Sequence, residues 1–148
     1  MGNMKRLRVV LDTNVLVAAL RSASGASRQL LLALRDGYFT ALVSVPLFIE
    51  YEATLKRTEL LNETRLSLSD IDELLDIVAA CCERTAIHYS WRPQLRDPKD
   101  EMVLETALNS RADALVTFNR ADFETVCANF GVELLSPSQF LERLRKRS

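Results

Sequence analysis

The sequence predicts an α/β domain built on a doubly wound, mostly parallel β-sheet of about five strands, with helices on both faces. Short apolar runs rich in β-branched residues alternate along the chain with longer segments of helical periodicity, and this alternation is the first observation behind the prediction. The second observation is that several runs are apolar throughout instead of at every other residue. Such strands are typical of parallel sheets that helices cover on both sides.

Strand and helix alternate through the first half of the chain. Leu7–Leu11 is a short apolar run that predicts a strand, and Asp12 follows it at the start of a helix. Ala26–Arg35 is Leu-rich and predicts a second helix, and Tyr38–Val45 predicts the next strand. Pro46 suits the first turn of a third helix, where its missing N–H costs nothing.

The same alternation continues in the second half. Ser69–Asp72 predicts a helix N-terminus, and the amphipathic stripe of that helix extends to Cys82. Ser136–Gln139 is a capping box with proline at the first helical position, so it predicts a terminal helix. Between them we expect a weak strand at Thr85–Tyr89, a helix at Asp100–Ser110, a strand at Ala114–Thr117, a helix at Asp122–Asn129 and a strand at Val132–Leu135.

Length and composition fit a single domain. The chain has 148 residues, of which 48% are hydrophobic and 26% charged, and we assign residues 5–140 to one domain with terminal extensions at 1–4 and 141–148. No apolar run approaches the roughly 20 residues needed to cross a bilayer, so we expect a soluble protein with no membrane partner. The three cysteines form no Cys-x-x-Cys pair, which favours the reducing cytoplasm.

The overall charge gives no general attraction to nucleic acid. The net charge is −1 and the isoelectric point is about 5.9, so phosphate binding would need a local patch. Basic residues cluster near both ends of the chain, and we interpret both clusters as solvated terminal segments. These residues are Lys5, Arg6 and Arg8 at the start and Arg143, Arg145, Lys146 and Arg147 at the end.

Polar residues follow several of the predicted strands. Ligands of parallel sheets bind at the carboxyl ends of the strands, where the strand order reverses. The residues at such positions are Asp12, Thr13 and Asn14 after the first strand, Ser44 at the end of the second, Asp97 and Asp100 before a helix, and Thr117 with Asn119 after a later strand.

Each of these residues also has an ordinary explanation. Asp12 could cap the helix that follows it, and Glu50 could be one more solvated charge on a helix. Asp100 could cap a helix after a turn, and Asn119 and Asp122 could be turn-forming residues.

Helical periodicity argues for a different interpretation of the two helical acids. Asp100 shares a helix face with Val103 and Leu104, and Glu50 shares one with Leu47. A charge placed on such a face needs a partner, and we find no Lys or Arg at a matching strand end. A divalent cation would serve, and oxygen ligands without accompanying His or Cys favour magnesium or manganese.

The sequence lacks the residues that several other catalytic and nucleotide-binding sites require. The single histidine, His88, excludes a two-histidine ribonuclease mechanism, and we expect it to pack at a strand edge. The chain has no Gly-x-Ser-x-Gly, Walker or Gly-x-Gly-x-x-Gly motif, so serine-hydrolase triads and the common nucleotide-binding loops are also excluded.

Four segments, taken in order, resemble one known family. They are Val9–Val15, Ser44 with Phe48–Glu52, Arg96–Leu104, and Ala112–Asn119, and the resemblance spans roughly residues 7–135. In these segments the chain resembles the PIN-domain nucleases, in particular the compact bacterial group that acts as toxins of toxin–antitoxin pairs. The resemblance implies a Mg²⁺- or Mn²⁺-dependent endoribonuclease that cleaves single-stranded RNA with one or two metal ions.

The resemblance also assigns roles to individual residues. The three core acids of the family fall on Asp12, Glu50 and Asp100, and a fourth acidic position falls on Asn119, which departs from the family pattern. The amide oxygen of Asn119 can still bind a metal, but with one negative charge fewer we expect the second ion to be held weakly. The residues expected to orient the ligands are Thr13, Asn14, Ser44 and Thr117, and those expected to compensate for the missing charge are Asp97 and Asp122.

Partners follow from the same resemblance. It implies a homodimer or larger homo-oligomer, and a cognate antitoxin protein that covers the site. The cations nearest the acids in sequence are Arg21, Arg28, Arg96 and Arg120. They are candidates for holding RNA phosphates, and each could equally be a plain surface charge.

Three alternatives remain open at this point. A DNA-directed or flap-type nuclease would share the acidic cluster, although the chain is short for one. A catalytically degenerate RNA-binding or regulatory module is kept open by Asn119. A phosphoacceptor domain with Asp12 as the phosphorylated group is disfavoured, because the chain lacks the adjacent acids and the strand-end lysine of such sites.

Overall fold

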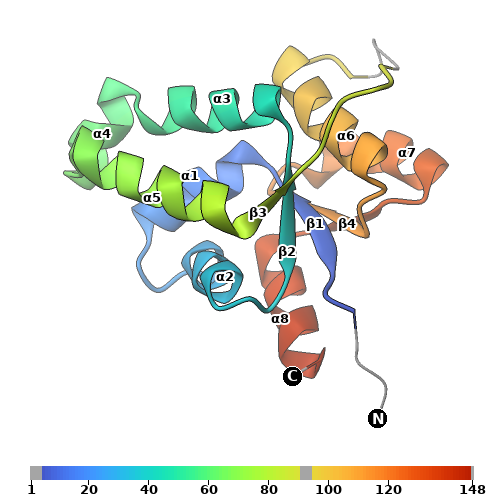
Figure 1. Cartoon of the computed structure of the whole chain (residues 1–148), viewed down its shortest axis with the longest axis horizontal. Helices are drawn as coiled ribbons and strands as arrows, with labels where there is room; N and C mark the ends of the chain where they lie inside the picture. Colours follow the sequence, from blue (N-terminus) through green and yellow to red (C-terminus); the bar gives the residue numbers. More distant parts are fainter. Residues whose placement is uncertain (1–4, 91–94, 148) are drawn as a thin grey trace.

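The computed structural model describes residues 5–90 and 95–147 and contains one five-stranded sheet in which every neighbouring pair is parallel. The strand order is β3-β2-β1-β4-β5 (Figure 1). This confirms the predicted α/β class. The strands are β1 at Arg8–Leu11, β2 at Thr40–Val43, β3 at Cys82–Arg84, β4 at Ala114–Val116 and β5 at Glu133–Leu135.

Helices connect every pair of consecutive strands. The strand order reverses between β1 and β4, so right-handed crossovers place α1 to α5 on one face of the sheet and α6 and α7 on the other. The helices of the described residues are α1 at Thr13–Arg21, α2 at Ala26–Arg35, α3 at Val45–Leu55, α4 at Thr58–Thr64, α5 at Leu68–Cys81, α6 at Pro98–Ser110, α7 at Arg120–Phe130 and α8 at Pro137–Arg147.

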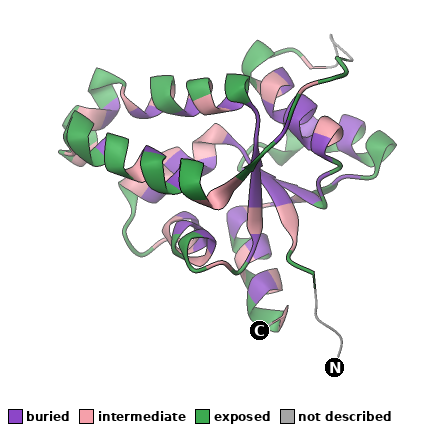
Figure 2. Ribbon diagram, in the orientation of Figure 1, coloured by how far each residue is buried: buried purple, intermediate pink, exposed green. Residues whose placement is uncertain are grey.

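The core lies on both faces of the central strands, which Figure 2 shows as buried along most of their length. Val9 and Val10 of β1 and Leu115 and Val116 of β4 are completely buried, as expected for strands covered on two sides. On the face covered by α2 and α8, the rings of Phe39 and Phe140 pack edge to face with their centroids 5.0 Å apart. The parallel pairing of β1 with β4 places the carboxyl ends of these two buried strands next to each other.

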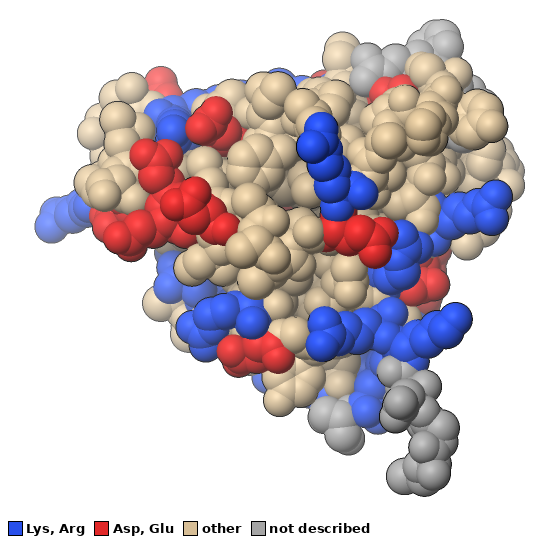
Figure 3. Space-filling view, viewed as in Figure 1, with Lys and Arg blue, Asp and Glu red and all other residues tan. Residues whose placement is uncertain are grey.

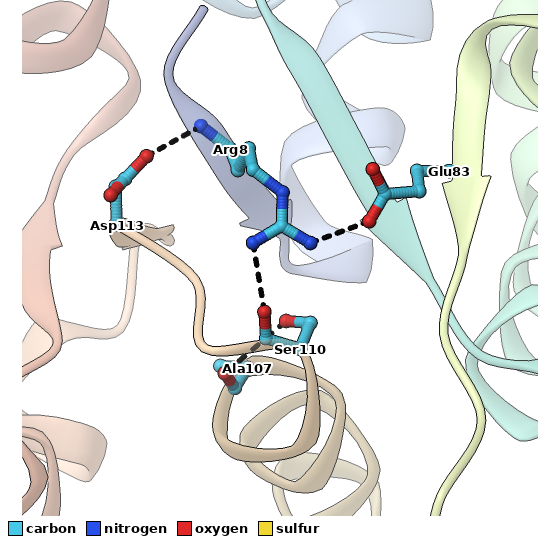
Figure 4. Close-up of polar contacts among 5 residues, drawn as sticks. All are labelled: Arg8, Glu83, Ala107, Ser110 and Asp113. Atoms are coloured by element: carbon cyan, nitrogen blue, oxygen red, sulfur yellow. Dashed lines mark hydrogen bonds and ion pairs between the residues drawn. The ribbon is translucent and has the colours of Figure 1, made fainter. Parts of the chain in front are cut away.

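Arg8 lies at the amino end of β1 and contacts neighbouring segments of the sheet and of α6 (Figure 4). Its backbone N–H donates to Asp113 at 2.8 Å, and its guanidinium donates to the carbonyl of Ser110 at 2.9 Å and pairs with Glu83. At the other end of the chain, Arg143 forms two hydrogen bonds to Glu133. The interpretation of both basic clusters as merely solvated segments is therefore wrong for these two arginines.

Four details of the structure differ from the expectation. The third strand is Cys82–Arg84 instead of Thr85–Tyr89, so Cys82 belongs to a strand and not to the preceding helix. His88 is exposed in the loop after β3, where its backbone N–H donates to the side chain of Asn109. Helix α4 was not expected, and α8 continues to Arg147.

No helix among residues 5–90 and 95–147 is long and apolar enough to span a membrane. The two described ends of the chain lie side by side, because Arg147 donates to the carbonyl of Lys5.

Candidate functional site

The carboxyl ends of β1 and β4 lie next to each other at the point where the strand order reverses. Asp12 follows β1 directly and Thr117 follows β4 directly, so the fold brings together two residues that are distant in sequence. The Thr117 hydroxyl donates to Asp12 Oδ2 at 2.6 Å. This is the position at which doubly wound sheets bind their ligands.

Asp12 is a buried carboxylate, with 6% of its surface exposed. It occupies the N-cap position of α1, although its side chain forms none of the usual capping hydrogen bonds. Burial raises the pKa of Asp12, whereas the Thr117 hydroxyl and the nearby backbone amides of Thr13 and Asn14 partly offset that rise. The Asn14 side-chain amide also approaches the Thr117 hydroxyl, at 3.5 Å.

Asp100 lies in the first turn of α6. Asp97 is the N-cap of this helix and accepts from the backbone N–H of Lys99 at 2.9 Å, so Asp100 is left without a capping role. Its pKa is raised to about 6, first by burial and then by repulsion from Asp12, Asp97 and Asp122, with a further contribution from Glu101. The site therefore concentrates negative charge in a partly desolvated position.

A cavity of about 550 Å³ collects several of the predicted acids. Asp97, Asp100 and Asp122 line it together with Arg96. Asp122 lies in the first turn of α7, directly beyond Asn119. The two acids that were expected to compensate for Asn119 thus border the same cavity as Asp100.

Asn119 is the exposed N-cap residue of α7, and its side chain makes no capping hydrogen bond. Its backbone N–H donates to the Thr117 hydroxyl at 2.9 Å. Thr117 therefore accepts from Asn119 while it donates to Asp12, and this arrangement fixes the direction of its hydroxyl proton.

Glu50 has a cationic partner that sequence reasoning missed. Its Oε1 atom accepts from the Thr54 hydroxyl at 2.9 Å and lies 3.6 Å from Nζ of Lys99. The argument that no Lys or Arg could serve Glu50 is therefore wrong, because the lysine comes from α6 and not from a strand end. Lys99 stands beside Asp100 in the sequence, but nothing in its local pattern indicates a contact with α3.

Ser44 is buried and has two local roles. Its hydroxyl caps α3 by accepting from the backbone N–H of Leu47, and it shares a 2.7 Å hydrogen bond with Thr106 of α6. Tyr51 of the same helix donates its hydroxyl to the carbonyl of Leu11. Helix α3, which carries Glu50, is therefore held against both α6 and the end of β1.

The donor chemistry of the site suits a hard divalent cation. Within the described residues Asp12 and Asp100 form no ion pair with Lys or Arg, and the repulsion that raises the pKa of Asp100 is what a cation would relieve. No group of three Asp, Glu, His or Cys residues in the described ranges is close enough to hold a metal as it stands. A bound ion would thus have to draw these carboxylates closer together.

Comparisons with known proteins agree with this architecture. A family model described as PIN domain matches residues 8–121. The fold is similar to a chain in the crystal structure of VapBC2 from Rickettsia felis bound to a DNA fragment from their promoter, with a TM-score of 0.61 and 16% identity over 88% of this chain and 98% of that chain. No curated protein matches the sequence. Because the family model covers most of the sheet and the whole Asp12–Thr117 region, the chain belongs to the PIN-domain family.

Proposed function

We propose that the chain is a metal-dependent endoribonuclease that hydrolyses phosphodiester bonds of single-stranded RNA, acting as the toxin of a toxin–antitoxin pair. The observation that carries this proposal is the buried Asp12, held by Thr117 at the strand-order reversal and close enough to Asp100 to raise its pKa. Membership of the PIN-domain family supports it, because these domains are generally metal-dependent nucleases. The choice of RNA follows the toxin group that the sequence resembles.

In this proposal Asp12, Glu50 and Asp100 hold one or two Mg²⁺ or Mn²⁺ ions, and Asn119 contributes its amide oxygen. Such an ion supplies an acidified water nucleophile and charge neutralisation at the phosphate. Thr117 orients the Asp12 carboxylate through its 2.6 Å hydrogen bond, and Asn14 supports Thr117, whose hydroxyl its side-chain amide approaches at 3.5 Å. Asp97 and Asp122 supply the negative charge that Asn119 lacks, since both border the cavity that Asp100 lines.

The four arginines considered as phosphate contacts have different surroundings. Arg96 lines the acidic cavity, and Arg120 begins α7 and donates to Gln139. Arg21 pairs with Glu63 at 2.7 Å, and Arg28 donates to the carbonyl of Ala19. We assign phosphate binding to Arg96, which borders the acidic cavity, and to Arg120, whose neighbour Ala121 also lines it.

The proposal extends to partners and location. We propose a homodimer or larger homo-oligomer in the cytoplasm and a cognate antitoxin that covers the site. The fold similarity to a chain of the VapBC2 complex supports an antitoxin partner. Val45 and Ile49 of α3 are exposed apolar residues beside Glu50, and such residues are suited to a protein interface.

Cleavage of matched single-stranded RNA and DNA, with Mg²⁺ or Mn²⁺ and with EDTA, tests the proposed function. The parent is expected to cleave RNA only with metal, and Asp12→Asn and Asp100→Asn are expected to be inactive. Asp76→Asn is the matched control, because Asp76 is exposed on α5 and does not line the acidic cavity.

Each other outcome identifies a different function. Equal residual cleavage by the parent and by Asp12→Asn would mean that another site or a contaminant is responsible. Cleavage of DNA alone would identify a DNA-directed nuclease. The absence of cleavage with either metal would favour a degenerate binding module.

A further inference from the structure

A second cavity lies along the contact between α6 and α7, at the end of both helices that is remote from the acidic cavity. It has a volume of about 500 Å³, within the range of small-ligand sites. Leu108 and Ala112 line it together with Tyr89, Arg111 and Phe130. The acidic cavity instead borders Asp100 and Asp122, at the start of the same two helices.

Helical periodicity places the two cavities on one side of the helix pair. On α6, Asp100 shares a face with Leu108, eight residues later, and Arg111 is the C-cap residue just after the helix. On α7, Asp122 and Phe130 are eight residues apart and also share a face. From Asp100 to Arg111 the path along the helix axis is about 16 Å. A single extended chain can therefore reach both cavities.

The residues around the second cavity suit a nucleobase. Tyr89 and Phe130 are 67% and 43% exposed, so each presents an aromatic surface at the cavity, and every base can stack on such a surface. Arg111 adds a planar cation that can stack on a base or pair with a phosphate. Figure 3 shows Lys and Arg side chains on the right of this face, where α6 and α7 lie.

The backbone of Arg111 makes the residue suitable for a test by substitution. It caps α6 in the left-handed conformation, with φ of 54°, at a position where glycine is ordinarily favoured. Glycine at this position would therefore keep the helix cap and remove only the side chain. Arg65 caps α4 in the same conformation, with φ of 61°, far from the α6–α7 contact.

We propose that the cavity bordered by Tyr89, Arg111 and Phe130 binds a base of the single-stranded RNA whose backbone passes the acidic cavity. The inference rests on the proposed function, because it takes RNA as the substrate. It assigns to this cavity a part in choosing which sequence is cut, at a distance from the scissile phosphate.

Fluorescence anisotropy with a labelled single-stranded RNA of about ten nucleotides, in EDTA, tests the inference without any cleavage. Arg111→Gly is expected to weaken binding about fivefold to a hundredfold, while its thermal midpoint stays the same or rises because the strained backbone is relieved. Phe130→Ala is expected to weaken binding by a similar factor. Arg65→Gly is the matched control and is expected to bind RNA as the parent does.

The inference is overturned if Arg111→Gly and Phe130→Ala bind RNA as tightly as the parent. It is also overturned if Arg65→Gly weakens binding as much as Arg111→Gly, because the loss would then come from the removal of any positive charge. A parent that does not bind RNA would overturn it as well. Failure of the proposed nuclease function would give a different result from failure of the base-binding inference. RNA binding that depends on Arg111, in a chain that cleaves nothing with metal, would keep the base site and remove the nuclease.

Discussion

Replacing Asp100 by asparagine is expected to stabilise the folded chain at neutral pH in the absence of metal. The pKa of Asp100 rises from 3.8 to about 6 in the folded state, through burial and through repulsion by Asp12, Asp97 and Asp122. An acid whose pKa is raised in the folded state has no effect on stability while both states are protonated, and it costs stability once the unfolded chain has lost that proton. Its cost to stability therefore appears as the pH rises from about 4 and is complete above about 6.

The size of this effect follows from the shift in the pKa. A change of about two units corresponds to about 3 kcal/mol at pH 7, and solvent screening of a half-buried group reduces it to about 1–2 kcal/mol. For a chain of this length, such a change raises the thermal midpoint by about 2–8 °C. Asparagine is neutral at every pH, so the advantage of Asp100→Asn should disappear near pH 4.

Thermal unfolding of the parent, Asp100→Asn and Asp76→Asn in EDTA, from pH 4 to pH 8, measures this difference. Asp76→Asn should change stability by less than about 0.5 kcal/mol at any pH, because Asp76 is exposed. Adding Mn²⁺ should stabilise the parent more than Asp100→Asn, since the ion binds the folded acidic site. A difference between parent and Asp100→Asn that is the same at pH 4 and pH 8 would refute the reasoning.

Three further changes test other parts of the molecule. Thr117→Val should lower the free energy of unfolding by about 2 kcal/mol in a urea titration, because Asp12 loses a charge-assisted hydrogen bond. For the same reason it should lower the cleavage rate about 10- to 100-fold. An unchanged cleavage rate would mean that Thr117 is not part of the site. Lys99→Met should change the free energy of unfolding by less than about 1 kcal/mol. It should tighten Mn²⁺ binding measured by calorimetry, because Glu50 loses a competing cation. Weaker Mn²⁺ binding would contradict the role of Lys99 as a competitor of the metal. Phe140→Ala should cost about 3–5 kcal/mol in urea unfolding, because a fully buried ring that packs on Phe39 is removed, and a loss below 1 kcal/mol would contradict that packing.

The meeting of Asp12 and Thr117 was predictable because it follows from chain direction. Both residues come immediately after buried parallel strands, and parallel strands place their carboxyl ends at one edge of the sheet. The reversal of strand order between β1 and β4 then makes the two residues neighbours. Local sequence pattern therefore predicted that both residues lie at one edge of the sheet, and the strand order of the fold makes them neighbours.

The position of β3 was not predictable from its own residues. Thr85–Tyr89 contains β-branched and aromatic residues, but pairing with β2 selects Cys82–Arg84, with Ala41 opposite Cys82 and Val43 opposite Arg84. The tertiary pairing therefore prevails over local propensity. The contact between Lys99 and Glu50 was missed for a similar reason, since it depends on how α3 packs against α6.

The contact of Arg147 with the carbonyl of Lys5 has a practical consequence for experiments on this protein. Both residues lie at the amino edge of the sheet, opposite to Asp12 and Thr117, because β1 begins there and α8 runs back to it from the end of β5. A fluorophore, an affinity tag or a fused protein attached at either end would stand clear of the acidic cavity. A short peptide joining the two ends would give a circular permutant, with new ends opened in the exposed loop at Ser22–Ser24.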